Sequence, residues 1–298
     1  MQKAYLLHMI TPEKNLSAFD VNMAFDAGWT AMPYLGVDLD EVRTIVQDTI
    51  FSRGPQGLKR TGIFIGGRDM HLAMDMFNAA KEAMVPPFEI SILTDPSGAF
   101  TTAAAMVAAV AKQLREKNEE ELTGQNILVI GGTGPVGASS AVLAAKLGAK
   151  VTILGRAIDK ANKVAELCNS RYGTVVEGIH GDAADHIDKL LPETDVIFAT
   201  AKAGIQVLSE EQVASATKLK VAADLNAVPP AGIAGISLLD NGVPLAASKS
   251  GAVGIGPLAI GDIKYQTQQK LLTQMYTGGT PLYLHFEDAF EVAMKKVK

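Results

Sequence analysis

The sequence is poor in cysteine, in long apolar runs and in clusters of basic residues, and each shortage argues against a class of protein. Cys168 is the one cysteine among 298 residues, which excludes an internal disulfide, and its helical context predicts a packed core residue. No run of about 18 apolar residues offers a membrane span, and the apolar stretch at the N-terminus is too short for a signal peptide. The net charge of −5 and the lack of a Lys/Arg-rich run argue against nucleic acid as the main partner. We therefore expect a cytoplasmic protein that binds a small molecule, with neither a nucleic acid nor a membrane as partner.

Histidine is also scarce, and its five positions do not have the spacing of metal ligands. They are His8, His71, His180, His186 and His285. The sequence offers no convincing catalytic triad either. We therefore expect structural roles for the histidines and no bound metal.

The most informative stretch that is present is NILVIGGTGPVG, at 126–137. Its first five residues form a continuous apolar run, which is typical of a parallel strand buried on both faces. Gly132, Gly134 and Gly137 follow with the spacing G-x-G-x-x-G, and an alanine-rich helix is expected from Ala138 to Gly148. In this context Gly132 permits a tight turn, Gly134 lets the backbone approach a pyrophosphate, and Gly137 lets the helix pack on the strand. The pattern predicts a dinucleotide site, with a purely structural glycine turn as the alternative.

The next strand, expected at 150–154, indicates which dinucleotide binds. It ends at Gly155-Arg156 and not at the acidic residue that usually holds the ribose of NAD. An arginine can bind a 2′-phosphate with two hydrogen bonds, and Lys160 or Lys163 could add charge. NADP is therefore preferred over NAD, unless Arg156 is an ordinary exposed arginine.

Strand and helix patterns alternate along the chain, which predicts an α/β fold with doubly wound parallel sheets. Apolar residues make up 48% of the sequence, enough for a large core, and the length suits two domains. The charged break KNEEE at 117–121 indicates a boundary nearby. Further strands are expected at 4–10, 31–36, 61–65, 175–178, 195–200 and 219–224, and helices at 38–49, 71–84, 159–171, 183–191 and 287–297. The basic stretch 53–60 is expected to be a solvated loop.

A polar turn, TDPSGAFTT at 94–102, follows the strand expected at 89–93 and opens a long helix. Ligands of open α/β sheets bind beyond the carboxyl ends of strands, so this turn is a candidate site. Its candidate residues are Asp95, Ser97, Thr101 and Thr102. Helix capping by Ser97 and Thr101 is the alternative interpretation.

Three other segments supply candidate residues. Asp20 lies at the start of a predicted helix, where it either serves the site or favours the helix dipole. Ala201–Gly204 and the rigid di-proline loop 224–235 each follow a strand, and we expect both near a cofactor. Residues 251–261 are expected to form a flexible, glycine-rich connection in which small residues let a flat ligand approach, before a helix from Lys264 to Tyr276.

Several strings together resemble a known family along nearly the whole chain. They are SAFDVN, DTIFSR, RTGIFIGG, DPSGAFTTAAAMV, GGTGPVG, DLNAVPPAGIAGI and GIGPLAIGDIKYQTQ. The chain is similar to the NAD(P)-dependent methylene-tetrahydromethanopterin dehydrogenases of methylotrophic bacteria. The resemblance implies hydride transfer from methylene-tetrahydromethanopterin to NADP or NAD in one-carbon (formaldehyde) oxidation, which yields the methenyl cation. It also implies a smaller α/β pterin domain, 1–122 completed by 264–298, a Rossmann-type domain at 123–263 and an active cleft between them.

The resemblance also implies roles for individual residues. The cofactor residues are Gly132, Thr133, Gly134, Pro135, Val136, Gly137, Arg156, Lys160, Ala201, Asn226 and Pro229. The substrate residues are Asp20, Asp95, Ser97, Thr101, Thr102, Gly256 and Lys264, of which Asp20, Asp95 and Lys264 are expected to serve catalysis. Lys264 as an exposed residue of a first helical turn is the alternative. We expect a homo-oligomer, a trimer or a hexamer. Most of the sequence resembles the branch that accepts both NAD and NADP, whereas Gly155-Arg156 looks like the strictly NADP-dependent branch.

The expected chemistry needs no general base, because removing a hydride from a methylene group between two amine nitrogens releases no proton. Catalysis would come from holding the two reactants together in a closed, water-free site. Two other functions stay open. One is a methylene-tetrahydrofolate dehydrogenase or a shikimate-dehydrogenase-like oxidoreductase, and the other is a non-enzymatic NADP sensor.

Overall fold

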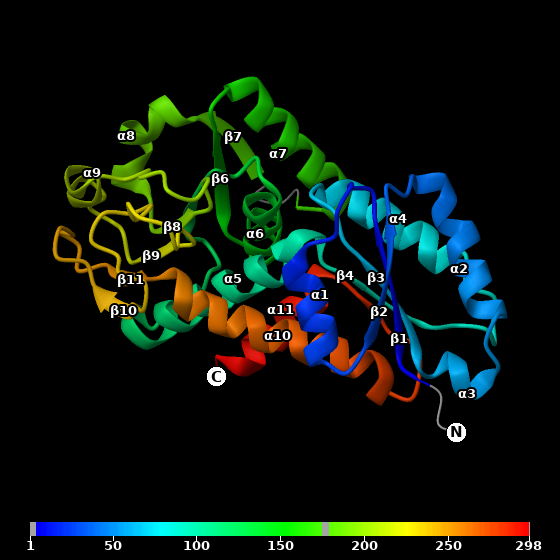
Figure 1. The fold of residues 1–298 in the computed structure, drawn as a ribbon. Coiled ribbons are helices and arrows are strands. Elements are labelled where there is room, and N and C mark those ends of the chain that lie inside the picture. The colour runs from blue at the N-terminus through cyan, green and yellow to red at the C-terminus, as the bar shows by residue number, and fades with distance from the viewer. Residues whose placement is uncertain (1–3, 175–178, 298) are drawn as a thin grey trace. The chain divides into compact units, whose positions relative to one another are not determined.

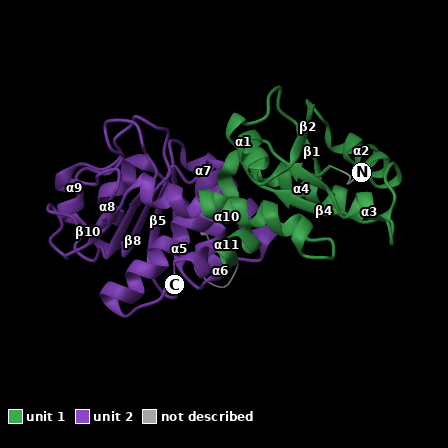
Figure 2. Cartoon of the chain, turned by 60° about the horizontal axis from the view of Figure 1, so that its bottom comes forward, with its two compact units in different colours: residues 1–101, 265–292 green, residues 102–264, 293–298 purple. Residues whose placement is uncertain are grey.

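The chain packs into two compact units, coloured separately in Figure 2. The structure is a computed structural model, and it describes residues 4–174 and 179–297. Unit 1 consists of Met1–Thr101 and Tyr265–Val292, and unit 2 of Thr102–Lys264 and Ala293–Lys298. Three helices run across these divisions: α5 (Ala99–Asn118), α10 (Pro257–Thr277) and α11 (Phe286–Lys296). The domain limits expected from the sequence, 1–122 with 264–298 and 123–263, stay a prediction.

Unit 1 is built on a parallel sheet with the strand order β12-β4-β3-β1-β2. Its strands β1 to β4 are labelled in Figure 1. The strands are β1 (Leu6–Thr11), β2 (Thr30–Leu35), β3 (Thr61–Ile65), β4 (Ser91–Thr94) and β12 (Tyr283–Leu284). Every residue of β3 and β4 is buried, as expected for inner strands of a parallel sheet that is covered on both faces. Because the strands are parallel, the segments that follow β1, β3 and β4 meet at one edge of the sheet.

The helices of unit 1 connect its strands. They are α1 (Ala18–Asp26), α2 (Val42–Phe51) after the 3₁₀ turn η1 (Leu39–Glu41), α3 (Pro55–Leu58), α4 (Met70–Glu82), and η2 (Pro96–Gly98), which leads into α5. The methionines of α4, Met70, Met74 and Met76, are buried and belong to the core of the unit. The indole N–H of Trp29 donates to the carbonyl of Leu272 at 3.0 Å, which ties the end of α10 to the N-terminal part of the unit.

Unit 2 contains a larger sheet with the strand order β10-β11-β9-β8-β5-β6-β7. The strands are β5 (Asn126–Ile130), β6 (Lys150–Gly155), β7 (Ile179–Ala183), β8 (Val196–Ala199), β9 (Val221–Asp224), β10 (Asn241–Pro244) and β11 (Val253–Ile255). The neighbours are parallel except for β10, which is antiparallel to β11. The chain starts at β5, runs outward through β6 and β7, and returns to β8 on the other side of β5. Such a reversal of strand order is where doubly wound sheets bind their ligands.

The helices of unit 2 connect these strands and are α6 (Pro135–Lys146), α7 (Ile158–Tyr172), α8 (Ile187–Leu190) between the 3₁₀ turns η3 (Ala184–His186) and η4 (Leu191–Glu193), and α9 (Glu210–Ser215). A core of Leu128, Ile197, Leu208 and Ala222 lies under the sheet and its connections. Cys168 on α7 is fully buried, and burial raises its pKa to about 12, so its predicted core role is confirmed. The predicted fold class, α/β with a Rossmann-type doubly wound sheet and a second α/β unit, is confirmed.

Some local predictions were wrong, because tertiary pairing overrides local pattern. Residues 251–261 are not a flexible connection: 253–255 form β11 between β9 and β10, and 257–261 are the first turns of α10. The helix predicted at 183–191 is broken, because Ala183 pairs with Gly155 in the sheet. The strand predicted at 175–178 lies outside the described residues.

The basic stretch 53–60 is also more than a solvated loop. It contains α3, and the guanidinium of Arg53 donates to Thr61 Oγ1 at 2.8 Å and to the carbonyl of Ala4 at 3.2 Å. Arg53 therefore fixes the entry of the chain into β3. Separately, no helix in 4–174 or 179–297 is long and apolar enough to cross a membrane.

Candidate functional site

The glycine-rich turn follows β5 at the point where the strand order reverses. Gly131 has a φ of +81°, so this residue, and not Gly132 as predicted, makes the left-handed turn. A Cβ at Gly131 would lie 2.7 Å from the backbone nitrogen of Ala201, and one at Gly132 would lie 2.5 Å from Cβ of Ile153. One at Gly137 would lie 2.6 Å from Cα of Gly132. The close packing predicted for Gly137 is therefore present, and it extends to Gly131 and Gly132.

Gly134 has different surroundings. A Cβ there would meet only the carbonyl oxygen of Gly131, at an ordinary 3.5 Å. Gly134 is also the N-cap of α6, Pro135 occupies the first turn, and no side chain caps the helix. The uncapped amides of a helix N-terminus attract an anion. The turn therefore leaves room in front of Gly134 where the fingerprint expects a pyrophosphate.

The end of β6 lies against this turn. A Cβ at Gly155 would be 2.8 Å from Cγ2 of Thr133, so the absence of a side chain at 155 lets the two segments touch. Arg156 follows directly and is exposed, and Lys160 is exposed in the first turn of α7. Two cationic side chains thus lie beyond the strand next to β5, where the second ribose of a dinucleotide is expected.

Two loops at the ends of β8 and β9 are joined through Asn226. Its Oδ1 accepts N–H bonds from Gly204 (2.9 Å) and Val228 (3.0 Å), and its Nδ2 donates to the carbonyl of Pro230 (2.6 Å). The side chain is buried and all its amide atoms are used within the loops, whereas Pro229 is exposed. Asn226 therefore shapes the surface that Ala201–Gly204 and Pro229 present.

Asp224 is a residue whose importance sequence reasoning missed. It is 1% exposed, and its carboxylate accepts N–H bonds from Asn226 (2.9 Å), Gly232 (2.7 Å) and Ile233 (3.0 Å). Burial raises the pKa of Asp224, while the three backbone donors lower it by less. Its position at the very end of β9 could have indicated a functional role. Its backbone partners could not be predicted, because they lie up to nine residues away.

A cavity of about 460 Å³ lies beside the di-proline loop. It is mainly apolar and is lined by Asn226, Val228, Pro229, Ala231, Ile236, Ser237, Leu238, Leu239 and Pro257. Asn226 and Pro257 follow the carboxyl ends of β9 and β11, so the cavity opens at the ligand-binding edge of the sheet. The predicted residues Asn226 and Pro229 thus border a space large enough for part of a ligand.

In unit 1, the Asp95 turn is organised by hydrogen bonds. Asp95 is fully buried, and its carboxylate accepts the N–H groups of Phe100 (2.9 Å) and Thr101 (3.1 Å) and the hydroxyl of Thr101 (2.6 Å). Ser97 has a φ of +51°, and its hydroxyl donates to the carbonyl of Gly67 at 2.7 Å. Capping of α5 therefore comes chiefly from Asp95, which the sequence had not singled out for that role. Thr102 is partly exposed one residue beyond.

Asp20 lies in the first turn of α1, where a carboxylate favours the helix dipole, as expected from the sequence. It is nevertheless buried, with 2% of its surface exposed. Its Oδ1 accepts an N–H bond from Nε2 of Gln268 at 2.9 Å, 248 residues away in the chain. Gln268 on α10 is fully buried and was not a predicted site residue. The feature of the sequence that could have pointed to Gln268 is its position four residues after the candidate Lys264 on the same helix.

Lys264 is 8% exposed and lies in the third turn of α10, so its interpretation as an exposed first-turn residue is wrong. It lies one turn before Gln268 on the same helix, and both side chains are buried. Gly256 lies at the start of α10 and is buried. A Cβ at this position would clash with the carbonyl oxygens of Ser237 and Leu238. The absence of a side chain at 256 therefore serves close packing of the backbone. No group of His, Cys, Asp and Glu in the described part of the chain could hold a metal ion.

Two family models match different parts of the chain. The family described as "Methylene-tetrahydromethanopterin dehydrogenase, N-terminal" matches residues 18–97, and the family described as "Shikimate / quinate 5-dehydrogenase" matches residues 113–233. Among solved structures, shikimate 5-dehydrogenase from Listeria monocytogenes has a TM-score of 0.54 at 13% identity, over 97% of this chain and 96% of that one. Ornithine carbamoyltransferase from Pyrococcus furiosus has a TM-score of 0.54 at 14% identity, over 93% and 86%. At these identities the likeness shows the fold alone.

Two relatives from Methylorubrum extorquens are similar in sequence. The bifunctional protein MdtA is 34% identical over 259 residues, 86% of this chain and 88% of the relative. The NAD(P)-dependent methylenetetrahydromethanopterin dehydrogenase is 45% identical over 292 residues, 97% of this chain and 98% of the relative. The resemblance seen in the sequence is thus confirmed, and the chain belongs to the family of NAD(P)-dependent methylenetetrahydromethanopterin dehydrogenases.

Proposed function

We propose that this protein oxidises methylene-tetrahydromethanopterin to the methenyl cation and transfers the hydride to NADP or NAD. The observation that carries the proposal is the 45% identity, over almost the whole of both chains, to an enzyme named for this reaction. A folate- or shikimate-type activity is not favoured, because the relative named for the methanopterin reaction is 45% identical, whereas the likeness to shikimate 5-dehydrogenase, at 13% identity, shows the fold alone.

The glycine turn of unit 2 fits a dinucleotide. The space in front of Gly134 and the uncapped first turn of α6, which contains Pro135 and Val136, suit a pyrophosphate. Gly132 and Gly137 hold the helix close to the sheet, and Thr133 contacts the end of β6. These features support the assignment of the cofactor to this turn.

We propose that Arg156 gives a preference for NADP. Its guanidinium is exposed beside the residue that contacts Thr133, so it can bind a 2′-phosphate with two hydrogen bonds. Lys160, one turn into α7, adds a second positive charge. Neither residue is needed for the ribose of NAD, so NAD remains a substrate.

The nicotinamide end of the cofactor is assigned to the loops held by Asn226. Ala201 packs against Gly131, and Pro229 and Asn226 border the apolar cavity at the same edge of the sheet. When bound, the nicotinamide supplies the hydride acceptor. The part of the chain is to shape a dry surface that holds the ring in one orientation.

The pterin is assigned to Asp20, Ser97, Thr102 and Lys264. Asp20 is fixed by Gln268, so its carboxylate has a defined position, and Lys264 presents an ammonium group from the same helix. We propose that both orient the pterin ring through hydrogen bonds. Asp95 and Thr101 build the turn that carries Ser97 and Thr102, and Gly256 lets α10 start close to its neighbours.

No proton leaves the substrate, so no described residue has to act as a base. The rate enhancement is ascribed to orientation, which can supply about 7–11 kcal/mol in well-aligned reactions. For the same reason we expect turnover to depend on the geometry of Asp20 and Lys264 more than on their protonation.

An assay of NADPH and NADH formation tests the proposal. Initial rates are compared for methylene-tetrahydromethanopterin and methylene-tetrahydrofolate, each with NADP and with NAD. We expect the methanopterin carrier with NADP to have the highest kcat/KM. A higher value with the folate carrier would assign the enzyme to folate metabolism, and binding of NADP without any reduction would indicate a sensor.

We further propose that the protein is a cytoplasmic homo-oligomer, a trimer or hexamer. Support comes from the family resemblance. Light scattering after size exclusion gives the mass of the assembly, and a mass of one chain would contradict it.

A further inference from the structure

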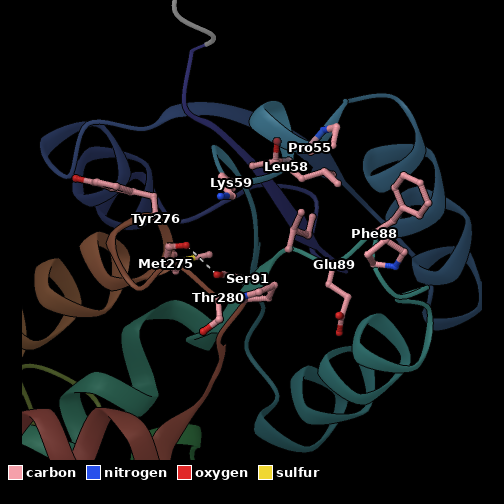
Figure 3. A pocket seen from close by; sticks show the side chains of 14 residues that line it. Pro55, Leu58, Lys59, Phe88, Glu89, Ser91, Met275, Tyr276 and Thr280 are labelled. Atoms are coloured by element: carbon pink, nitrogen blue, oxygen red, sulfur yellow. Dashed lines mark hydrogen bonds between the residues drawn. The ribbon is translucent and has the colours of Figure 1, made fainter.

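A second cavity lies in unit 1, away from the residues assigned to pterin and dinucleotide. It has a volume of about 360 Å³, within the range of small-molecule sites. Its lining comes from three segments: the stretch before β3, the stretch before β4, and the end of α10 with the loop before β12 (Figure 3). These are the amino ends of neighbouring parallel strands. Asp95 follows the other end of β4, roughly 13 Å along the strand from Ser91 at about 3.3 Å per residue.

Hydrogen bonds fix the walls of this cavity. The hydroxyl of Ser91 donates to the carbonyl of Met275 at 2.8 Å and accepts the N–H of Leu282 at 3.1 Å. Phe88 forms a two-residue bridge with Val85, in which its N–H donates to the Val85 carbonyl at 2.6 Å. Thr61 bonds the carbonyl of Gly57 at 2.8 Å. The three lining segments are therefore tied to the sheet or to themselves, and the cavity is part of the fold.

The lining is apolar, with one cation at its rim. Leu58, Phe88, Ile90 and Met275 contribute hydrocarbon surface together with three prolines. The ammonium of Lys59 has no hydrogen-bond or ion-pair partner within the described residues. In Figure 3 Lys59 lies on the side of Met275 and Tyr276, whereas the side chain of Glu89 points away from it.

Glu89 is already engaged. It accepts the hydroxyl of Tyr283 at 3.0 Å, and burial together with this carboxylate raises the pKa of Tyr283 to about 12. The cavity therefore combines hydrocarbon walls, one positive charge without a partner, and one negative charge that has a partner. A ligand with an apolar body and a single acid group complements this arrangement.

We propose that this cavity binds a small apolar carboxylate, aromatic or branched, with its acid group on Lys59 and its body against Leu58 and Met275. The site is separate from the proposed reaction site and does not depend on which carrier or cofactor the enzyme uses. Its occupant would touch the last turn of α10, the helix that carries Lys264 and Gln268, so it is placed to influence that helix.

The single tryptophan makes the site observable. Trp29 is 2% exposed, and its ring packs edge-on against Tyr276, a lining residue, at 5.2 Å between centroids. Occupancy of this cavity should therefore change the emission of Trp29. The probes are 4-phenylbutyrate and its uncharged match, 4-phenylbutan-1-ol, titrated into the full chain.

We expect a saturable change in Trp29 emission as the acid is added. The alcohol should bind with a dissociation constant about three- to tenfold higher. Lys59→Met should raise the dissociation constant of the acid to that of the alcohol and leave the dissociation constant of the alcohol unchanged. Thr280→Phe, which adds bulk at the rim, should weaken both, while Lys270→Met, an exposed lysine elsewhere on α10, should change neither. Far-UV circular dichroism checks that each variant is folded.

Two results would overturn the proposal. One is the absence of a saturable change with the acid in the wild type. The other is an unchanged dissociation constant in Lys59→Met, which would mean that the acid group lies elsewhere. Neither result bears on the dehydrogenase reaction, which is assayed separately.

Discussion

Two buried carboxyl groups, those of Asp95 and Asp224, hold loops at the carboxyl edges of the two sheets. Each accepts three hydrogen bonds, mainly from backbone N–H groups. Sequence reasoning placed both at strand ends, where ligands bind. It could not tell a loop-holding role from a ligand-holding role, because the partners lie two to nine residues away and depend on the loop conformation.

Asp224→Asn should therefore destabilise the protein. At least one backbone N–H would face the new amide N–H₂ and would lose its acceptor. The free energy of unfolding at neutral pH should therefore fall by about 1–3 kcal/mol. Urea denaturation measures this loss. An unchanged free energy would mean that the loop does not need this acceptor.

The pH dependence of that difference has a defined sign. Because the pKa of Asp224 is raised in the folded state, ionising its carboxyl group costs more there than in the unfolded state. The part of the stability that comes from the protonated form is fully present below the unfolded pKa and is lost as pH rises through the folded pKa. The wild type should thus lose stability relative to Asp224→Asn over this window. A difference that grows in favour of the wild type would contradict the raised pKa.

Arg156→Ala tests cofactor choice with NAD as the internal control. Loss of the bidentate phosphate contact should raise the KM for NADP by roughly 10- to 100-fold and leave the KM for NAD nearly unchanged. Steady-state kinetics with both cofactors gives the answer. Equal losses with NADP and NAD would remove Arg156 from the 2′-phosphate site.

Lys264 is buried, which strengthens the case for a role beyond solvation. Lys264→Ala should raise the KM for the pterin and lower kcat, because a tilted ring loses its alignment, with NADP affinity almost unchanged. Lys264→Met keeps much of the stem and separates charge from packing. A Met variant with wild-type constants would show that the ammonium group is not used.

At the scale of elements, the glycine turn separates binding from folding. Gly134 has space for a side chain, whereas a Cβ at Gly137 would meet the backbone of Gly132. Gly134→Val should therefore abolish NADP binding and leave the unfolding temperature almost unchanged. Gly137→Val should lower the unfolding temperature. Calorimetry with NADP and thermal unfolding measure the two effects, and tight NADP binding by Gly134→Val would make the glycines purely structural.

Elements with a strong local pattern could be predicted from the sequence. The apolar run of β5 was predicted with its observed bounds, and the glycine turn and α6 followed it. The short strands β10, β11 and β12 were missed, because two to four residues give too little pattern and their pairing is long-range. Gln268 was missed for the same reason, since its partner Asp20 lies 248 residues away.

At the scale of the whole molecule, the alternation of strands and helices predicted the α/β class and the chain length predicted two domains, and the structure has two α/β units. The similarity to one enzyme, 45% identity, extends over 97% of this chain and so covers both units. The chemistry can therefore be assigned to the chain as a whole. The roles of single residues still depend on the geometry within each unit.

The central claim is that a hydride passes directly from the methylene carbon to the nicotinamide, without a proton transfer. It is tested with methylene-tetrahydromethanopterin that carries two deuterium atoms on the methylene carbon, with NADP, in ordinary water. Mass spectrometry of the product should show one deuterium in each NADPH formed, and the reaction with unlabelled substrate in heavy water should show none. NADPH that takes its hydrogen from the solvent, or no NADPH at all, would contradict the account.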